Sequence, residues 1–162
     1  MFNEKERIAA AQWILERNLT WIAAAEIKVG VIVTIDIAML GGLATAFTTS
    51  DQTAHTAWAY LCTLSAAVTA AVAIFCAAMS VLPRVNGPAH SFIFFGRIVE
   101  TDSATYSDRF RKVAGAELLN DLTAQIHRNA EIAATKFGWV SKSMGWSFLS
   151  VIPWVAAIAM LN

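Results

Sequence analysis

The chain has 162 residues, of which 57% are hydrophobic and only 15% are charged, and its twelve basic side chains balance its twelve acidic ones. Soluble domains carry about 25% charged residues. The shortage of charge is concentrated in three long apolar stretches, which excludes a simple soluble globule and a disordered chain. The pI is near 6.8, so the chain has no overall excess of positive charge of the kind that binds nucleic acid.

The N-terminal part of the chain predicts one long helix that enters a membrane. Asn3 and Glu6 form a capping-box pattern, and apolar residues then recur on one helical face. No Gly or Pro interrupts the pattern before Gly30. The first apolar stretch, residues 29–47, is long enough to span a bilayer and contains Asp36 as its only ionisable group.

Two further stretches predict spanning helices. Residues 58–82 contain no charge at all, and the Pro- and Gly-rich segment 83–88 ends this helix. The third stretch, residues 143–161, contains Pro153. A membrane helix tolerates proline when its neighbours satisfy the freed backbone groups, so we expect a kink there and not a break.

The segment between the second and third spans is predicted to be mostly helical. Ser103 is expected to cap a short helix that runs to about Val113, with a break at Gly115. From Glu117 onward, apolar residues recur at helical spacing, and this helix should continue into the third span. Residues 91–98 give the only weak strand signal.

The basic residues predict the orientation. All twelve Lys and Arg residues fall in segments 1–28 and 83–142, and none falls in the loop 48–57 or at the C-terminal end. The positive-inside rule therefore places both basic segments in the cytosol and the C-terminus on the opposite side of the membrane. The predicted fold class is an all-α membrane protein with three transmembrane helices, whose long cytosolic helical extensions form a small helical cytosolic domain. Its segments are a cytosolic N-terminal helix 1–28, spans 29–47, 58–82 and 143–161, and a cytosolic sensor region 83–142.

Catalytic motifs are absent from the sequence. It contains no Gly-rich phosphate loop, no G-x-S-x-G and no H-E-x-x-H, and its three histidines are scattered. We therefore expect no catalytic residue, no metal site and no bound cofactor.

Asp36 is the residue within the spans that needs an explanation. A carboxylate near the middle of a span costs at least ~2.5 kcal/mol to insert, so it should face other helices or water. Two interpretations stay open: Asp36 lines a pore, or it hydrogen-bonds a neighbouring helix.

Small residues at four-residue spacing form ridges in the first two spans. Ala38 and Gly42 form one ridge, and alanines form others in residues 58–82. Such ridges let helices approach closely, either within one chain or in a homo-oligomer. Because three helices enclose little space, a pore would need several copies.

Polar side chains gather at the ends of the predicted cytosolic helices that lie next to the spans. Basic groups there could bind the phosphate of a small anion, and amides could bind a base edge. A solvated helix face explains the same residues equally well. They are Glu26, Lys28, Arg97, Gln125, His127, Arg128, Asn129 and Lys136.

The order of short motifs around the three spans resembles the Pycsar transmembrane effectors (PycTM-like). The motifs are Trp21–Gly30 before the first span, Pro83-Arg84, Phe94–Ile98, Tyr106, and Gln125–Ala130 with Lys136 before the last span. The resemblance extends from about residue 13 to residue 160.

The resemblance implies an antiphage defence effector of the bacterial inner membrane. Such an effector senses cyclic UMP or cyclic CMP made by a partner pyrimidine nucleotide cyclase and impairs the membrane, so that the infected cell stops growing or dies. Among matching positions we assign the ligand contacts on chemistry. Arg97 and Lys28 are chosen for the phosphate, Gln125 and Asn129 for the pyrimidine edge, Tyr106 for stacking, and Gly96 for close backbone approach.

Two other functions fit the same sequence. One is a membrane anchor or accessory scaffold subunit that holds a cytosolic partner through its helical extensions. The other is an unregulated, holin-like pore that would dissipate the membrane potential without any nucleotide.

Overall fold

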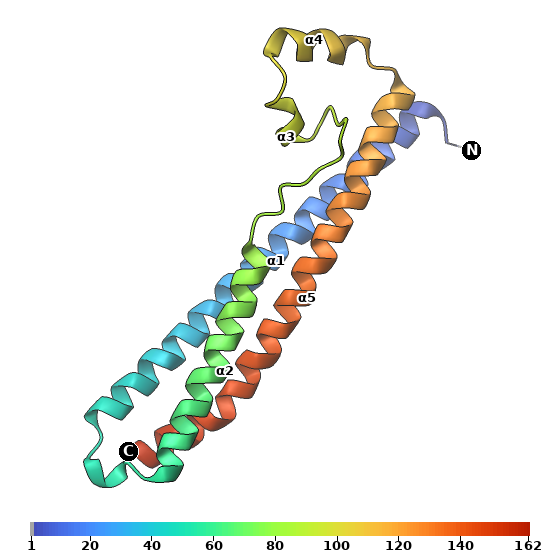
Figure 1. The fold of residues 1–162 in the computed structure, drawn as a ribbon. Helices are drawn as coiled ribbons and strands as arrows, with labels where there is room; N and C mark the ends of the chain where they lie inside the picture. Colours follow the sequence, from blue (N-terminus) through green and yellow to red (C-terminus); the bar gives the residue numbers. More distant parts are fainter. Residues whose placement is uncertain (1) are drawn as a thin grey trace. The chain divides into compact units, whose positions relative to one another are not determined.

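The computed structural model describes residues 2–162, and all of its regular elements are helices (Figure 1). It contains three long helices and three short helical segments. In chain order these are α1 (Glu4–Thr49), η1 (Gln52–Ala54), α2 (Ala57–Val81), α3 (Phe95–Ile98), α4 (Ser103–Lys112) and α5 (Gly115–Leu161). Helices α1, α2 and α5 are each long and apolar enough to cross a membrane. The prediction of an all-α chain with three such helices is therefore confirmed.

The structure divides into two compact units. The first unit contains the chain up to Ala24 together with Pro83–Thr135, and the second contains Ala25–Leu82 together with Lys136–Asn162. Helices α1 and α5 each contribute residues to both units, and neither helix is interrupted where it passes from one to the other. This confirms the expectation that two long helices continue into apolar segments.

The helix ends test the capping predictions. Asn3 and Glu6 form the predicted capping box, because the Glu6 N–H donates to Asn3 Oδ1 at 2.9 Å and the Asn3 N–H donates to Glu6 Oε2 at 2.8 Å. The prediction that Ser103 caps α4 was wrong by one residue. Asp102 is the cap, and its Oδ1 accepts the N–H groups of Ala104 and Thr105. A carboxylate at this position also interacts favourably with the positive end of the helix.

Two other details differ from the sequence predictions. The break before α5 lies at residues 113–114, and Gly115 is the first residue of α5. Within residues 2–162 no strand forms, so the weak strand signal at residues 91–98 was wrong; the last four of these residues form α3. Pro153 lies inside α5, and the helix continues on both sides of it.

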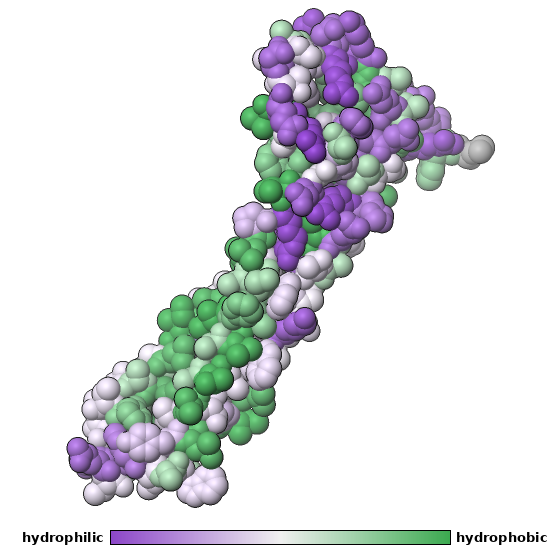
Figure 2. Space-filling model, in the orientation of Figure 1, coloured by the Kyte–Doolittle hydropathy of each residue, from purple (hydrophilic) through white to green (hydrophobic). Residues whose placement is uncertain are grey.

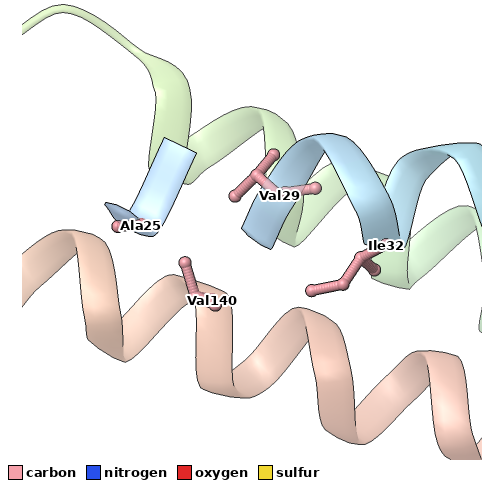
Figure 3. Close-up of a cluster of buried hydrophobic side chains, with 5 residues drawn as sticks. Ala25, Val29, Ile32 and Val140 are labelled. Carbon is pink, nitrogen blue, oxygen red and sulfur yellow. The ribbon is translucent and has the colours of Figure 1, made fainter. Parts of the chain in front are cut away.

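Small side chains let the helices of the second unit pack closely. Ala25, Val29 and Ile32 of α1 meet Ala77 of α2 and Val140 of α5 in one cluster, of which Figure 3 shows the α1 and α5 side chains. The alanine ridge of α2 points into this unit and is buried along its length, at Ala66, Ala70, Ala73 and Ala77. For this ridge, packing within one chain is therefore the observed role.

The outer surface of the second unit is apolar. Phe148 and Ile152 of α5 are 69% and 72% exposed, and Phe75 of α2 is 61% exposed. In Figure 2, hydrophobic residues cover most of the visible face of this unit. A surface of this kind is stable against lipid but not against water.

Candidate functional site

In the first unit, the segment after α2 is fastened to α5 by a buried carboxylate. Asp121 of α5 lies one turn before Gln125, and its Oδ2 accepts the backbone N–H of Phe92 at 2.6 Å and that of Ile93 at 3.3 Å. Because Asp121 is buried, these two donors replace the water that would otherwise solvate its charge. The contact fixes residues 91–94 against the helix.

Ser91 and Gln125 make a second attachment beside the first. The Ser91 hydroxyl oxygen accepts the N–H groups of Ile93 and Phe94 and the side-chain amide of Gln125, which lies at 2.9 Å. Both side chains are buried. Asn129, one turn further along α5, donates its side-chain amide to the Gln125 backbone carbonyl at 2.9 Å. These bonds hold the two predicted amide residues in defined positions.

A cavity of about 290 Å³ lies beside these amides, within the first unit. It has walls from three parts of this unit: helix α1, the segment after α2, and one face of α5. The lining combines apolar side chains with amides and two guanidinium groups. Its residues are Leu15, Leu19, Arg84, Asn86, Ile93, Phe94, Phe95, Gln125, Arg128, Asn129 and Ile132.

The chemistry of this lining suits a small anion with a planar ring. Arg84 and Arg128 provide guanidinium donors of the type that bind phosphate. Arg128 is oriented by two bonds, one from Nε to the Asn86 carbonyl at 2.7 Å and one from Nη1 to Glu131. Gln125 and Asn129 provide amide groups of the type that bind a base edge. The volume lies near the lower end of the range for small-molecule sites.

Two other predicted residues lie in a neighbouring cavity of the same unit. Gly96 and Arg97 line a space of about 330 Å³ that shares Asn86 and Phe94 with the first cavity. Arg97 holds both carboxylate oxygens of Glu100 with Nη1, at 3.0 and 2.9 Å. A phosphate at this position would therefore compete with Glu100 for the guanidinium group.

Gly96 has a packing role that the sequence did not predict. A side chain at Gly96 would approach a ring carbon of Phe94 to 2.7 Å, and a side chain at Gly87 would also collide with this ring. Both glycines therefore make room for Phe94, which lines both cavities. A role for Gly96 in close approach of the ligand stays a prediction.

Tyr106 and Lys28 have other neighbours. The Tyr106 hydroxyl donates to the Phe92 carbonyl at 3.1 Å, and Tyr106 lies outside both cavity linings as the structure gives them. Lys28 belongs to the second unit, where its Nζ lies 5.3 Å from the centre of the Phe137 ring. The structure thus brings Gln125 and Asn129 together, with Gly96 and Arg97 in the adjoining cavity.

Three polar members of the first cavity were not chosen as ligand contacts from the sequence: Arg84, Asn86 and Arg128, of which only Arg128 was named among the groups that could bind an anion. Arg128 shares a helical face with Gln125, Asn129 and Ile132, and this spacing of three, four and seven residues could have identified it. Arg84 and Asn86 follow α2 in an irregular segment, so no local periodicity reveals where they point.

The second unit contains the residues that were predicted to line a pore or to pack helices. Asp36 is fully buried, and the Ser147 hydroxyl donates to its Oδ1 at 2.8 Å. A side chain at Gly42 would lie 3.7 Å from Trp154, so Gly42 faces α5 within the same chain. Ala38 is exposed. Asp36 therefore makes the hydrogen bond to a neighbouring helix that one of its two interpretations required. A role for Asp36 in lining a pore stays a prediction.

A comparison with protein families gives one match. The model described as the Pycsar effector protein domain, PycTM, matches residues 10–161, which include most of both units. No similar protein was found among curated proteins or among solved structures. The match confirms the resemblance that the motifs of the sequence indicated.

Proposed function

The chain belongs to the Pycsar effector family, and from this premise we propose that it senses cyclic UMP or cyclic CMP in the cytosol and impairs the bacterial inner membrane in response. Membership makes it an antiphage defence effector that is activated by a cyclic nucleotide and is functionally coupled to a cyclase. Effectors of this family disrupt membranes and are not catalytic. The pyrimidine ligand, the growth arrest or death of the infected cell, and assembly as a homo-oligomer belong to the proposal.

The main support for the proposal is the continuity of α1 and α5. Both helices line the cavity of the first unit, and both continue without interruption into the apolar second unit. A ligand shifts a conformational equilibrium only through its different affinity for the two states. A site between two such helices is well placed to bind differently when either helix moves.

The nucleotide would occupy the cavity between Gln125, Arg128 and Asn129. In this proposal Arg128, with Arg84, binds the cyclic phosphate, and the amides of Gln125 and Asn129 bind the pyrimidine edge. The apolar side chains from α1 and the 93–95 segment pack against the ring and the sugar. Arg97 stays a candidate for the phosphate through the adjoining cavity, whereas Lys28 is not part of this lining.

The distribution of basic residues supports the proposed orientation. All twelve Lys and Arg residues lie in segments 1–28 and 83–142, which favours a cytosolic position for the first unit and for the cavity. The three apolar helices would then cross the inner membrane, and the C-terminus would face the periplasm. In this arrangement the ligand site lies in the compartment where a cyclase releases its product.

Calorimetry on the purified chain in detergent micelles tests the ligand assignment. We expect cyclic UMP or cyclic CMP to bind, and Arg128→Ala to weaken binding by about 10- to 100-fold, since hydrogen bonds to charged groups contribute about 1.5–3 kcal/mol. Arg111→Ala removes the same charge from an exposed position on α4 and should leave the affinity unchanged. Absence of binding by either nucleotide, or equal losses in the two variants, would contradict the proposal.

Measurement of membrane potential in cells separates this function from its rivals. The proposed effector requires both the chain and the nucleotide for depolarisation. Depolarisation by expression alone would indicate the holin-like pore. Copurification with a cytosolic protein and no depolarisation under any condition would indicate the scaffold.

A further inference from the structure

The face of α5 that points into the second unit is unusually polar. Lys136, Ser143, Ser147, Ser150 and Trp154 follow one another at spacings of seven, four, three and four residues, which places them on one side of the helix. Ser143 and Ser150 are fully buried, and Lys136 is 4% exposed. In a lipid-facing segment the polar side of a helix is expected to contact protein or water.

Three side chains on this face of α5 bond directly to the other two helices. The Ser143 hydroxyl donates to the Ala73 carbonyl of α2, the Ser147 hydroxyl donates to Asp36 of α1, and Trp154 Nε1 donates to the Met39 carbonyl of α1, each at 2.8 Å. The buried face of α5 thus combines these hydrogen-bonding groups with apolar residues such as Val140 and Ala157, while Phe148 and Ile152 point outward.

The carboxyl group of Asp36 has only one of its two oxygens in a hydrogen bond. Its side chain is fully buried and Oδ1 accepts the Ser147 bond, but Oδ2 is buried without a hydrogen-bond partner. A buried carboxyl oxygen without a donor is costly in an apolar surrounding. This cost is present in the arrangement that the structure shows, which points to a use of the group in another arrangement.

We propose that the three serines of this face of α5, together with Asp36, line the path for ions when α5 moves away from α1 and α2, and that Asp36 makes this path selective for cations. Lys136 lies outside this lining, since its ammonium group pairs with Glu26 at 2.8 Å. The inference rests on the proposed function, since it specifies how the membrane is impaired. Serine hydroxyls can replace part of the hydration of an ion, and an ionised carboxylate attracts cations and repels anions. Several copies would have to contribute this face, because three helices enclose too little space.

Flux from proteoliposomes under a KCl gradient tests the inference. The purified chain is reconstituted, cyclic UMP or cyclic CMP is added, and the reversal potential gives the permeability of K⁺ relative to Cl⁻. We expect the intact chain and Asp36→Glu to prefer K⁺, and Asp36→Asn to conduct with this preference lost. Thr34→Val is the matched control, because Thr34 is exposed two residues away on α1 and its hydroxyl bonds only within that helix, to the Gly30 carbonyl.

The possible outcomes separate this inference from the proposed function. Equal permeability to K⁺ and Cl⁻ in the intact chain, or an unchanged preference in Asp36→Asn, would overturn the inference. Selective flux that needs no nucleotide would support the path and contradict nucleotide gating. Nucleotide binding by calorimetry without flux of any ion would overturn the path, while the sensing part of the proposed function would stand.

Discussion

Asp121 determines how the segment after α2 is held in the first unit. Its buried Oδ2 accepts the Phe92 N–H at 2.6 Å and the Ile93 N–H at 3.3 Å. The shorter bond, to a charged acceptor, should contribute about 2 kcal/mol and the longer one much less. We therefore expect Asp121→Ala to reduce the free energy of local opening of residues 91–94 by about 2.5 kcal/mol, and to leave two N–H groups without their acceptor.

Hydrogen exchange at the Phe92 and Ile93 amides measures this loss. Because each 1.36 kcal/mol corresponds to a factor of ten, both amides should exchange roughly 70-fold faster in Asp121→Ala. Asn120→Ala changes the neighbouring, exposed side chain and should leave both rates unchanged. Nucleotide affinity should fall in Asp121→Ala as well, since the same segment lines both cavities. Unchanged exchange at the two amides would refute the anchoring role of this carboxylate.

Three further substitutions or conditions have defined outcomes. Glu26→Ala leaves the buried Lys136 ammonium without the carboxylate at 2.8 Å, so the unfolding temperature in detergent should fall, and adding Lys136→Met should restore it; no recovery in the double variant would contradict this explanation. Ala77→Leu overfills the space around this fully buried alanine and should lower the free energy of unfolding by about 1–3 kcal/mol. Ala71→Leu, on the exposed side of α2, should leave the free energy of unfolding unchanged. Hydrogen bonds from the side chain and the backbone N–H of Thr105 lower the pKa of Asp102. The cap of α4 should therefore be intact above the ordinary aspartate pKa of 3.8 and be lost as the pH falls below it, which amide exchange at Thr105 would report; a cap that weakens as the pH rises would contradict the assignment.

The long helices could be predicted from the sequence because their signals are local. Charge-free windows of sufficient length identify α2, and the capping box of Asn3 and Glu6 marks the beginning of α1. The predicted cap of α4 was off by one residue because Asp102 and Ser103 are adjacent and both are good capping residues. The local sequence does not decide which of two adjacent capping residues begins the helix.

The candidate site was only partly predictable. Gln125 and Asn129 belong to a regular helix, so their shared face follows from their spacing. The contribution of Arg84 depends on how the irregular segment after α2 folds back, and this is determined by contacts between distant residues such as Asp121 and Phe92. Lys28 was chosen for the phosphate because it is a basic residue at a position that matches the family, but it belongs to the second unit.

Ion flux and nucleotide binding, measured on the same proteoliposome preparation, test most directly whether binding in the first unit acts on the second. Because both units share α1 and α5, addition of cyclic UMP or cyclic CMP should start flux over the same concentration range in which calorimetry detects binding. Saturation with the bound nucleotide and no change in flux would contradict coupling through these helices.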